Sequence, residues 1–256
     1  MDAAALPVCP AGMDPVEWRL RLELAACYRL FDWMGWTTLI YNHISVRVPA
    51  PEPQFLINHF GLHYTEVTAR NLLKIDVEGR KLDPSPHPVN AAGFVIHSAI
   101  HAARDDAHCI AHTHTTAGMA VACKASGLRH DNFNSALLHG QVAYHDFEGV
   151  TTDAAEKPRL VASIGAKPIL ILRNHGLLVA AASVPEAFGL MATLEKACEV
   201  QLATDSLAGP TLAIGADVLA AIPAQNAAVA KASSRPGQMV FDACLRRAGI
   251  RYADLA

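Results

Sequence analysis

Hydrophobic positions along this chain recur with the period of a strand in some stretches and with the period of a helix in others. Short runs that alternate or are wholly apolar, and that are bounded by residues such as Gly, Pro or Asn, predict strands. These strands are expected at 42–48, 54–58, 72–77, within 107–116, and at 141–144, 168–173 and 177–181. Longer runs with apolar residues three or four positions apart predict helices. These helices are expected at 15–34, 91–103, about 115–124, 154–164, 185–207, 216–232 and 238–248.

The order of these elements predicts the fold class. Strands and helices are interspersed along the chain, without an internal repeat or a separating linker, which favours one α/β domain with a mixed sheet. Asp14 followed by Pro15 is typical of the first turn of a helix. We therefore expect residues 1–13 to form a flexible lead and residues 14–256 to form a single domain with a helical C-terminal end.

Composition narrows the class of protein further. The 256 residues are 52% hydrophobic and 18% charged, which is typical of a globular chain with a full core. The formal net charge is −3 and the basic residues are scattered, so nothing favours nucleic acid or an anionic membrane as a partner. No apolar run of about 18 residues predicts a membrane span, and no signal-peptide pattern is present. Six widely spaced cysteines without a C-x-x-C pair are typical of a reduced, cytoplasmic protein.

Two histidines one residue apart, His112 and His114, stand at the end of an apolar strand. Side chains at i and i+2 of a strand share a face, so both imidazoles are expected to point the same way at its carboxyl end. A second buried strand ends in Asn174-His175-Gly176, where the glycine frees the backbone and lets the histidine project. Three imidazoles with an open fourth position form a catalytic type of zinc site, and manganese, iron or cobalt are alternatives. The competing interpretation is that these histidines are packed or solvated at strand ends.

These histidines fall within longer motifs that share an order and a spacing. The motifs are 42–47, 56–62, 66–72, 110–115 and 170–177. From about residue 19 to about residue 203 they are similar to the class II aldolase/adducin family. The resemblance implies a three-layer α/β/α domain with a central, largely antiparallel mixed sheet, and a homo-oligomer, either tetramer or dimer. In the sugar-phosphate aldolases of that family the matching histidines bind zinc, which implies a metal role for His112, His114 and His175.

Several departures from the aldolase pattern concern proton transfer and phosphate binding. The family's catalytic glutamate lies nineteen residues before the first histidine of the pair, and this position is Gly93, which cannot take a proton. The two serines that precede the glutamate and help hold phosphate correspond to Ala91 and Ala92. A phosphate-contacting threonine corresponds to Phe60, and the family's early asparagine, Asn42, follows a tyrosine instead of a glycine. These changes predict a non-phosphorylated substrate.

Two stretches, 92–104 and 142–149, are close to the pattern of the adducin head and its free-standing microbial relatives. Adducin binds actin and spectrin, and that binding depends on a neck and a Lys-rich tail. This chain ends at Ala256 after a short helical region, so actin binding is implied by family analogy alone. The adducin head also keeps the histidine triplet, so the triplet predicts a metal without establishing catalysis.

Other candidates are less specific. His97 and His101 stand four positions apart on a predicted helix, and we favour a packing role or a role behind the metal ligands. Arg173 precedes the third histidine, and we expect it to pair with a structural acid rather than to clamp a substrate carboxylate.

A polar cluster at 144–148 is a candidate for the missing acid/base. His145, with Asp146 and Glu148 nearby, could transfer a proton, and Tyr144 could donate to a developing oxyanion. We therefore name Tyr144 and His145 as candidate catalytic residues. The alternative is a polar loop at the surface.

Two functions remain open from the sequence. The first is a metal-dependent lyase that cleaves a C–C bond of a small molecule through a metal-stabilised enolate, acting on a non-phosphorylated, aromatic or keto-acid substrate. Decarboxylase or oxygenase chemistry on the same fold is a variant of this hypothesis, by analogy. The second is a binding or scaffold protein that keeps the metal for structure. A catalytic site has an open coordination position, whereas a structural site is closed by a fourth protein ligand.

Overall fold

Strands form in this protein at short apolar runs, two of which end directly at Pro49 and Asn58. The computed structural model describes residues 6–89, 91–150, 153–231 and 235–256. The strands are β1 (His43–Val48), β2 (Gln54–Ile57), β3 (Leu73–Asp76), β4 (Cys109–Thr113), β5 (Val142–His145), β6 (Ile169–Leu172) and β7 (Gly176–Ala181). The helices are α1 (Pro15–Trp33), α2 (Ala91–Ala103), α3 (Thr116–Ala122), α4 (Phe133–Leu137), α5 (Lys157–Ile164), α6 (Val184–Asp205), α7 (Ala216–Lys231) and α8 (Gln238–Ala248).

The seven strands form one sheet in the order β3-β2-β1-β4-β7-β6-β5. Neighbouring strands are antiparallel except for β5 and β6, which run parallel. β4 lies between β1 and β7, and His112 has His43 of β1 opposite it on one side and Leu178 of β7 on the other. The prediction of a mixed, largely antiparallel sheet is confirmed.

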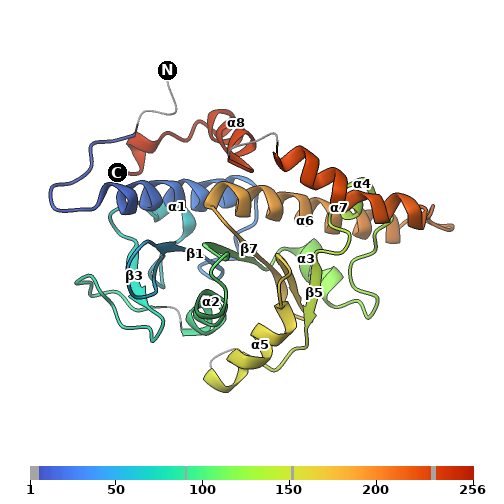
Figure 1. The fold of residues 1–256 in the computed structure, drawn as a ribbon, viewed down its shortest axis with the longest axis horizontal. Helices are drawn as coiled ribbons and strands as arrows, with labels where there is room; N and C mark the ends of the chain where they lie inside the picture. The colour runs from blue at the N-terminus through green and yellow to red at the C-terminus, as the bar shows by residue number, and fades with distance from the viewer. Residues whose placement is uncertain (1–5, 90, 151–152, 232–234) are drawn as a thin grey trace.

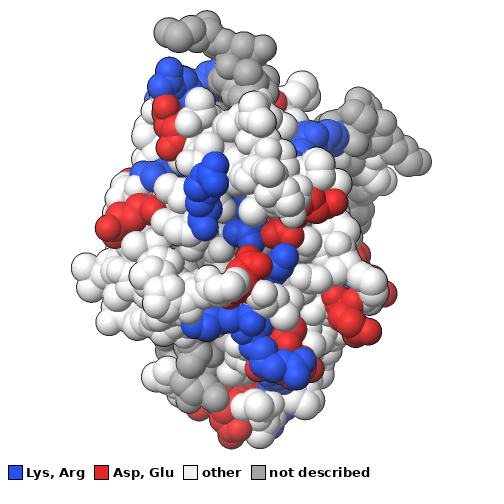
Figure 2. All heavy atoms as spheres, turned by 90° about the vertical axis from the view of Figure 1, so that its left-hand side faces the viewer, with Lys and Arg blue, Asp and Glu red and all other residues white. Residues whose placement is uncertain are grey.

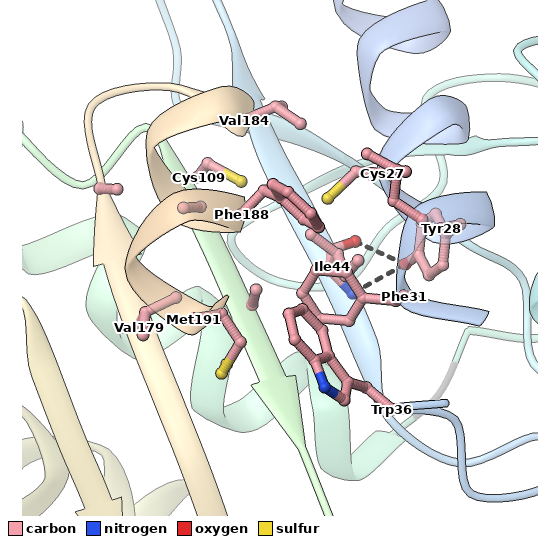
Figure 3. Close-up of a cluster of buried hydrophobic side chains, with 14 of the residues drawn as sticks. Cys27, Tyr28, Phe31, Trp36, Ile44, Cys109, Val179, Val184, Phe188 and Met191 are labelled. Carbon is pink, nitrogen blue, oxygen red and sulfur yellow. Dashed lines mark hydrogen bonds between the residues drawn. The ribbon is translucent and has the colours of Figure 1, made fainter. Parts of the chain in front are cut away.

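Helices cover both faces of this sheet (Figure 1). α1 and α6 lie side by side on one face with α8 packed against both, while α2 and α5 cover the other face. The larger core fills the space beneath α1 and α6, where Phe31, Ile44 and Phe188 meet (Figure 3). A second core beneath α2 and α5 includes Ile100 and Leu170. The predicted three-layer α/β/α arrangement is confirmed.

Side-chain caps begin several of the helices, namely α1, α3, α4 and α6. The Asp14 carboxylate caps α1 by accepting from the N–H groups of Val16 at 2.8 Å and Glu17 at 3.0 Å. Each predicted strand and helix is present, with ends that shift by a few residues. The helix predicted from 154 begins as a 3-10 turn, Ala154–Glu156. The short α4 has no predicted counterpart, because five residues are too few to show a helical period.

Residues 1–5 of the predicted lead lie outside the described residues. Farther along, the Trp18 indole donates to the Pro7 carbonyl at 3.1 Å. The division into a flexible lead and a domain spanning 14–256 stays a prediction. None of the described helices combines the length and the apolarity needed to cross a bilayer. On the face drawn in Figure 2, basic and acidic side chains are interspersed.

The Tyr28 hydroxyl joins α1 to β1 inside the core. It donates to the Ile44 carbonyl at 2.6 Å and accepts from the Ile44 N–H at 2.8 Å (Figure 3). We predict that Tyr28→Phe lowers the free energy of unfolding by about 1–3 kcal/mol, because buried backbone groups lose their partner. Urea denaturation checks this, with Tyr41→Phe as the control, because Tyr41 is 48% exposed. Equal unfolding midpoints for the two variants would contradict the assignment.

Candidate functional site

Three histidines from two separate strand ends converge in the structure. His112 belongs to β4, His114 follows its last residue, and His175 lies in the turn between β6 and β7. Their candidate ligand nitrogens all lie within 4.8 Å of one another. The structure thus brings together the three residues for which the sequence predicts a metal role, and we call them the histidine cluster. Their role as metal ligands stays a prediction.

The turn that carries His175 depends on its two neighbours. Asn174 adopts a left-handed conformation with φ of +57°, which asparagine tolerates better than most residues. A Cβ on Gly176 would overlap the Thr113 carbonyl oxygen and lie 3.0 Å from the His114 ring. Glycine is therefore needed here for close approach of β7 to the end of β4.

Hydrogen bonding and burial prepare the cluster for a cation. His112 Nδ1 lies 2.8 Å from the Leu177 carbonyl oxygen, which can only accept, so Nδ1 carries the proton. Its Nε2 lone pair then faces His114 Nε2 at 2.7 Å. Burial lowers the pKa of all three histidines, and lowers that of His114 to about 4. Neutral imidazoles with converging nitrogens are the form that binds metal, so the donor set fits a divalent ion.

The histidine cluster lines a pocket with a volume of about 320 Å³. That volume suits a small molecule. Its other walls are largely apolar or aromatic and are contributed by Tyr41, Phe60, Ile96, Phe147 and Val150, together with Asn42, His43 and Gly149. Among the described residues that line it, none is Lys or Arg. The pocket therefore offers no cationic side chain from these residues to a phosphate group.

Polar contacts hold the end of β4 from both sides. Thr113 and Thr115 donate their hydroxyl protons to the two carboxylate oxygens of Glu195 on α6, each at 2.6 Å. On the pocket side, the Asn42 amide accepts from the His114 N–H at 3.1 Å in the orientation that satisfies both of its ends. These contacts fix the backbone on which two of the three histidines stand.

A chain of buried hydrogen bonds runs away from the cluster beneath α2. His43 Nδ1 lies 2.7 Å from His97 Nε2, and His97 Nδ1 lies 2.6 Å from Ser45 Oγ. Ser45 Oγ lies 2.8 Å from His101 Nε2, and His101 Nδ1 lies 2.9 Å from the Ala107 carbonyl oxygen. We call this the histidine chain. Burial lowers the pKa of His43 and of His101 to about 3, so these imidazoles are neutral.

Tyr144 and His145 lie on β5, which is separated from β7 by β6. The Tyr144 hydroxyl accepts from the Leu128 N–H at 3.0 Å. His145 Nδ1 lies 2.9 Å from the Ser163 hydroxyl and its Nε2 lies 3.3 Å from Glu156. Neither side chain lines the pocket of the histidine cluster, although His145 shares a narrow crevice with His175. Their catalytic roles stay predictions.

Arg173 contacts Tyr144 and Asp146 and does not line the pocket of the histidine cluster. Its guanidinium lies 3.4 Å from Asp146 and 4.6 Å from the centre of the Tyr144 ring. The expected pairing with an acid is therefore present. The side chains of Ala91 and Ala92, where the family pattern places phosphate-holding serines, lie outside the described part of the structure.

Comparison with known proteins places this chain in a family. The model of the class II aldolase and adducin N-terminal domain matches residues 22–202, which is more than half of the chain. The chain belongs to the class II aldolase and adducin family. The family resemblance and the fold expected from the sequence are thereby confirmed.

Individual relatives include both enzymes and adducins. An aldolase II superfamily protein from Pseudomonas syringae superposes with a TM-score of 0.86 at 43% identity, covering 92% of this chain and 94% of that one. The L-fuculose 1-phosphate aldolase of Glaciozyma antarctica PI12 gives a TM-score of 0.77 at 28% identity, covering 96% of each chain. Alpha-adducin of Rattus norvegicus is 48% identical over 199 residues, which are 77% of this chain and 27% of adducin.

Two residues near the cluster, Glu195 and His43, are not among the site residues predicted from the sequence. Glu195 lies on a long apolar helix, where one acid gives no signal of its partners. His43 stands in a strand motif, and only the register opposite His112 brings it to the pocket.

The buried histidines predict a dependence of stability on pH. The pKa of His101 is lowered from 6.5 to about 3 by burial, so between these values the unfolded chain binds a proton that the folded protein does not. Stability contributed by neutral His101 is present above pH 6.5 and is lost as the pH falls through this window.

We predict that His101→Gln makes the free energy of unfolding less dependent on pH below pH 6.5. The slope against pH should fall by about 1.4 kcal/mol per pH unit relative to the wild type. Chemical denaturation between pH 7 and about 4 measures the slope. The wild-type protein, measured under the same conditions, gives the reference slope. A His101→Gln slope equal to that of the wild type would contradict the burial of a neutral histidine.

Proposed function

We propose that this protein is a metal-dependent lyase that makes or breaks a C–C bond next to the carbonyl group of a non-phosphorylated small molecule. The observation that carries the proposal is the convergence of His112, His114 and His175 within 4.8 Å beside a pocket of about 320 Å³. Membership of the class II aldolase and adducin family supports the same reaction class.

The histidine cluster would hold a divalent cation, with zinc as the first candidate and manganese, iron or cobalt as alternatives. When bound, the cation supplies Lewis-acid stabilisation for negative charge that develops on a carbonyl oxygen. The Leu177 carbonyl keeps the Nε2 lone pair of His112 directed at the cluster. The Glu195 contacts to Thr113 and Thr115 keep the strand end from shifting.

The walls of the pocket support a substrate without phosphate. Phe60 and Phe147 border the histidine cluster, and the Phe147 ring centre lies 6.4 Å from that of His175. Aromatic side chains exclude water and favour an apolar or aromatic substrate portion. A phosphate group would need cationic or hydrogen-bonding partners, and Lys and Arg are absent from the described lining.

A second candidate function is binding without catalysis, as in a scaffold protein. The 48% identity to alpha-adducin and the glycine at position 93 favour it. The two functions differ in whether protons exchange on a bound donor molecule, because a scaffold has no reason to accelerate that exchange.

The deciding experiment follows hydrogen–deuterium exchange next to a carbonyl. We expect the zinc- or manganese-loaded protein to exchange these protons of hydroxyacetone or pyruvate in D₂O, measured by ¹H NMR. Removing the metal with a chelator, or His175→Ala, should reduce the rate by at least about 100-fold. His139→Ala is the matched control and should exchange like the wild type, since His139 is outside the pocket.

Two results would overturn the proposal. Exchange no faster than with metal and buffer alone, in a protein that has bound the metal, favours the scaffold function. Exchange with dihydroxyacetone phosphate but with neither unphosphorylated donor contradicts the assigned substrate class.

A further inference from the structure

Gly93 and His43 share one space beside the histidine cluster. A Cβ built on Gly93 would lie 2.5 Å from His43 Nε2, closer than any real Cβ contact allows. A side chain at position 93 and the present His43 ring therefore exclude each other. Gly93 has no side chain that could transfer a proton. The space that such a side chain would fill holds the imidazole ring of His43 from β1.

The histidine chain fixes which nitrogen of His43 carries the proton. At its far end the Ala107 carbonyl only accepts, so His101 donates from Nδ1 and accepts at Nε2 from the Ser45 hydroxyl. Ser45 Oγ has then given its one proton and accepts from His97 Nδ1, and His97 Nε2 accepts from His43 Nδ1. With neutral imidazoles, this arrangement satisfies every contact and leaves a lone pair on His43 Nε2.

His43 Nε2 takes no part in the histidine chain. His43 lines the pocket, and its Nδ1 is bonded to His97 on α2, so Nε2 is the ring nitrogen left for a pocket ligand. The ring centre lies 5.4 Å from that of His112. Among the described residues, the group that could hold an ion consists of His112, His114 and His175, so His43 stands beside the ion site and outside it.

We propose that His43 is the catalytic residue that accepts and returns the substrate proton, in place of the glutamate that the family has at the Gly93 position. This inference rests on the proposed function, because it assigns the proton acceptor of the same reaction. The C–H bond next to the carbonyl breaks, and its electron pair enters the carbonyl system as an enolate. The proton goes to His43 Nε2, which becomes an imidazolium, and the reverse step returns a proton to carbon.

His97, Ser45 and His101 are positioning residues in this account. They do not reach the pocket, and they hold the Nδ1–H tautomer of His43 through the Ala107 carbonyl. Ser45→Ala should let the tautomer change, because His97 loses the acceptor for its Nδ1 proton. We expect kcat for exchange to fall with little change in KM.

The sharpest test removes the imidazole of His43 and places a carboxylate at position 93. His43→Ala should lower the rate of deuterium exchange by about 100-fold or more while metal content is unchanged. His43→Ala combined with Gly93→Glu places a carboxylate in the vacated space. This double variant should exchange deuterium at least about tenfold faster than His43→Ala alone. The matched double variant with Gly93→Gln has nearly the same shape but no base, and should show no recovery. Equal rates for His43→Ala and the wild type overturn the inference, as does equal recovery by Glu and Gln.

A spectroscopic readout keeps the inference testable without activity. ¹⁵N NMR of histidine-labelled protein, assigned with His43→Phe, should show the proton on Nδ1 of His43. Its Nε2 signal should move when acetohydroxamate, a bidentate metal ligand, is added to zinc-loaded protein. A proton on Nε2 in the metal-free protein, or a bond from Nε2 to the metal, overturns the inference. If the wild type exchanges no donor, the proposed function fails and the catalytic role of His43 fails with it, whereas a proton on Nε2 in a protein that does exchange a donor overturns the role of His43 alone.

Discussion

The antiparallel pairing of β4 with β1 on one side and β7 on the other is the constraint on which the site depends. This register puts His43 opposite His112, and it brings the start of β7 against the carbonyl group of Thr113. A shift of one residue would turn His112 toward α6 and Thr113 toward α2. Gly176 permits the close approach, and Glu195 holds the strand end from the opposite face.

The sheet thus separates two environments with one set of strands. Residues of β1 alternate between the apolar core under α1, represented by Ile44, and a polar row under α2, represented by His43 and Ser45. Neutral imidazoles buried in that row are costly to protonate, so each needs a hydrogen-bond partner in its neutral form. The hydrogen bonds of the histidine chain therefore stabilise the folded protein and also fix the tautomer of His43.

Much of the fold could be predicted from the sequence, because long segments rich in apolar residues begin at capping residues and prolines, as at Asp14-Pro15 for α1 and Ser183 with Pro185 for α6. The ion-binding half of the candidate site could also be proposed, since His112 and His114 share a strand face and His175 ends another strand. What the sequence could not supply was the pairing of strands far apart in the chain. His43 and Gly93 are fifty positions apart, and only the packing of α2 on β1 shows that they compete for one space. The placement of Tyr144 beyond β6 is likewise a consequence of strand order.

The coordination of a metal bound to the purified protein tests the central claim most directly. Metal analysis and X-ray absorption, with an anomalous-scattering crystal structure, would identify the ion and its ligands. We expect one divalent ion per chain, bound by His112, His114 and His175 at about 2.0–2.1 Å for zinc, with a further position held by water or a small molecule. Failure to bind zinc, manganese or iron, or closure of the site by a fourth protein ligand, would contradict the account.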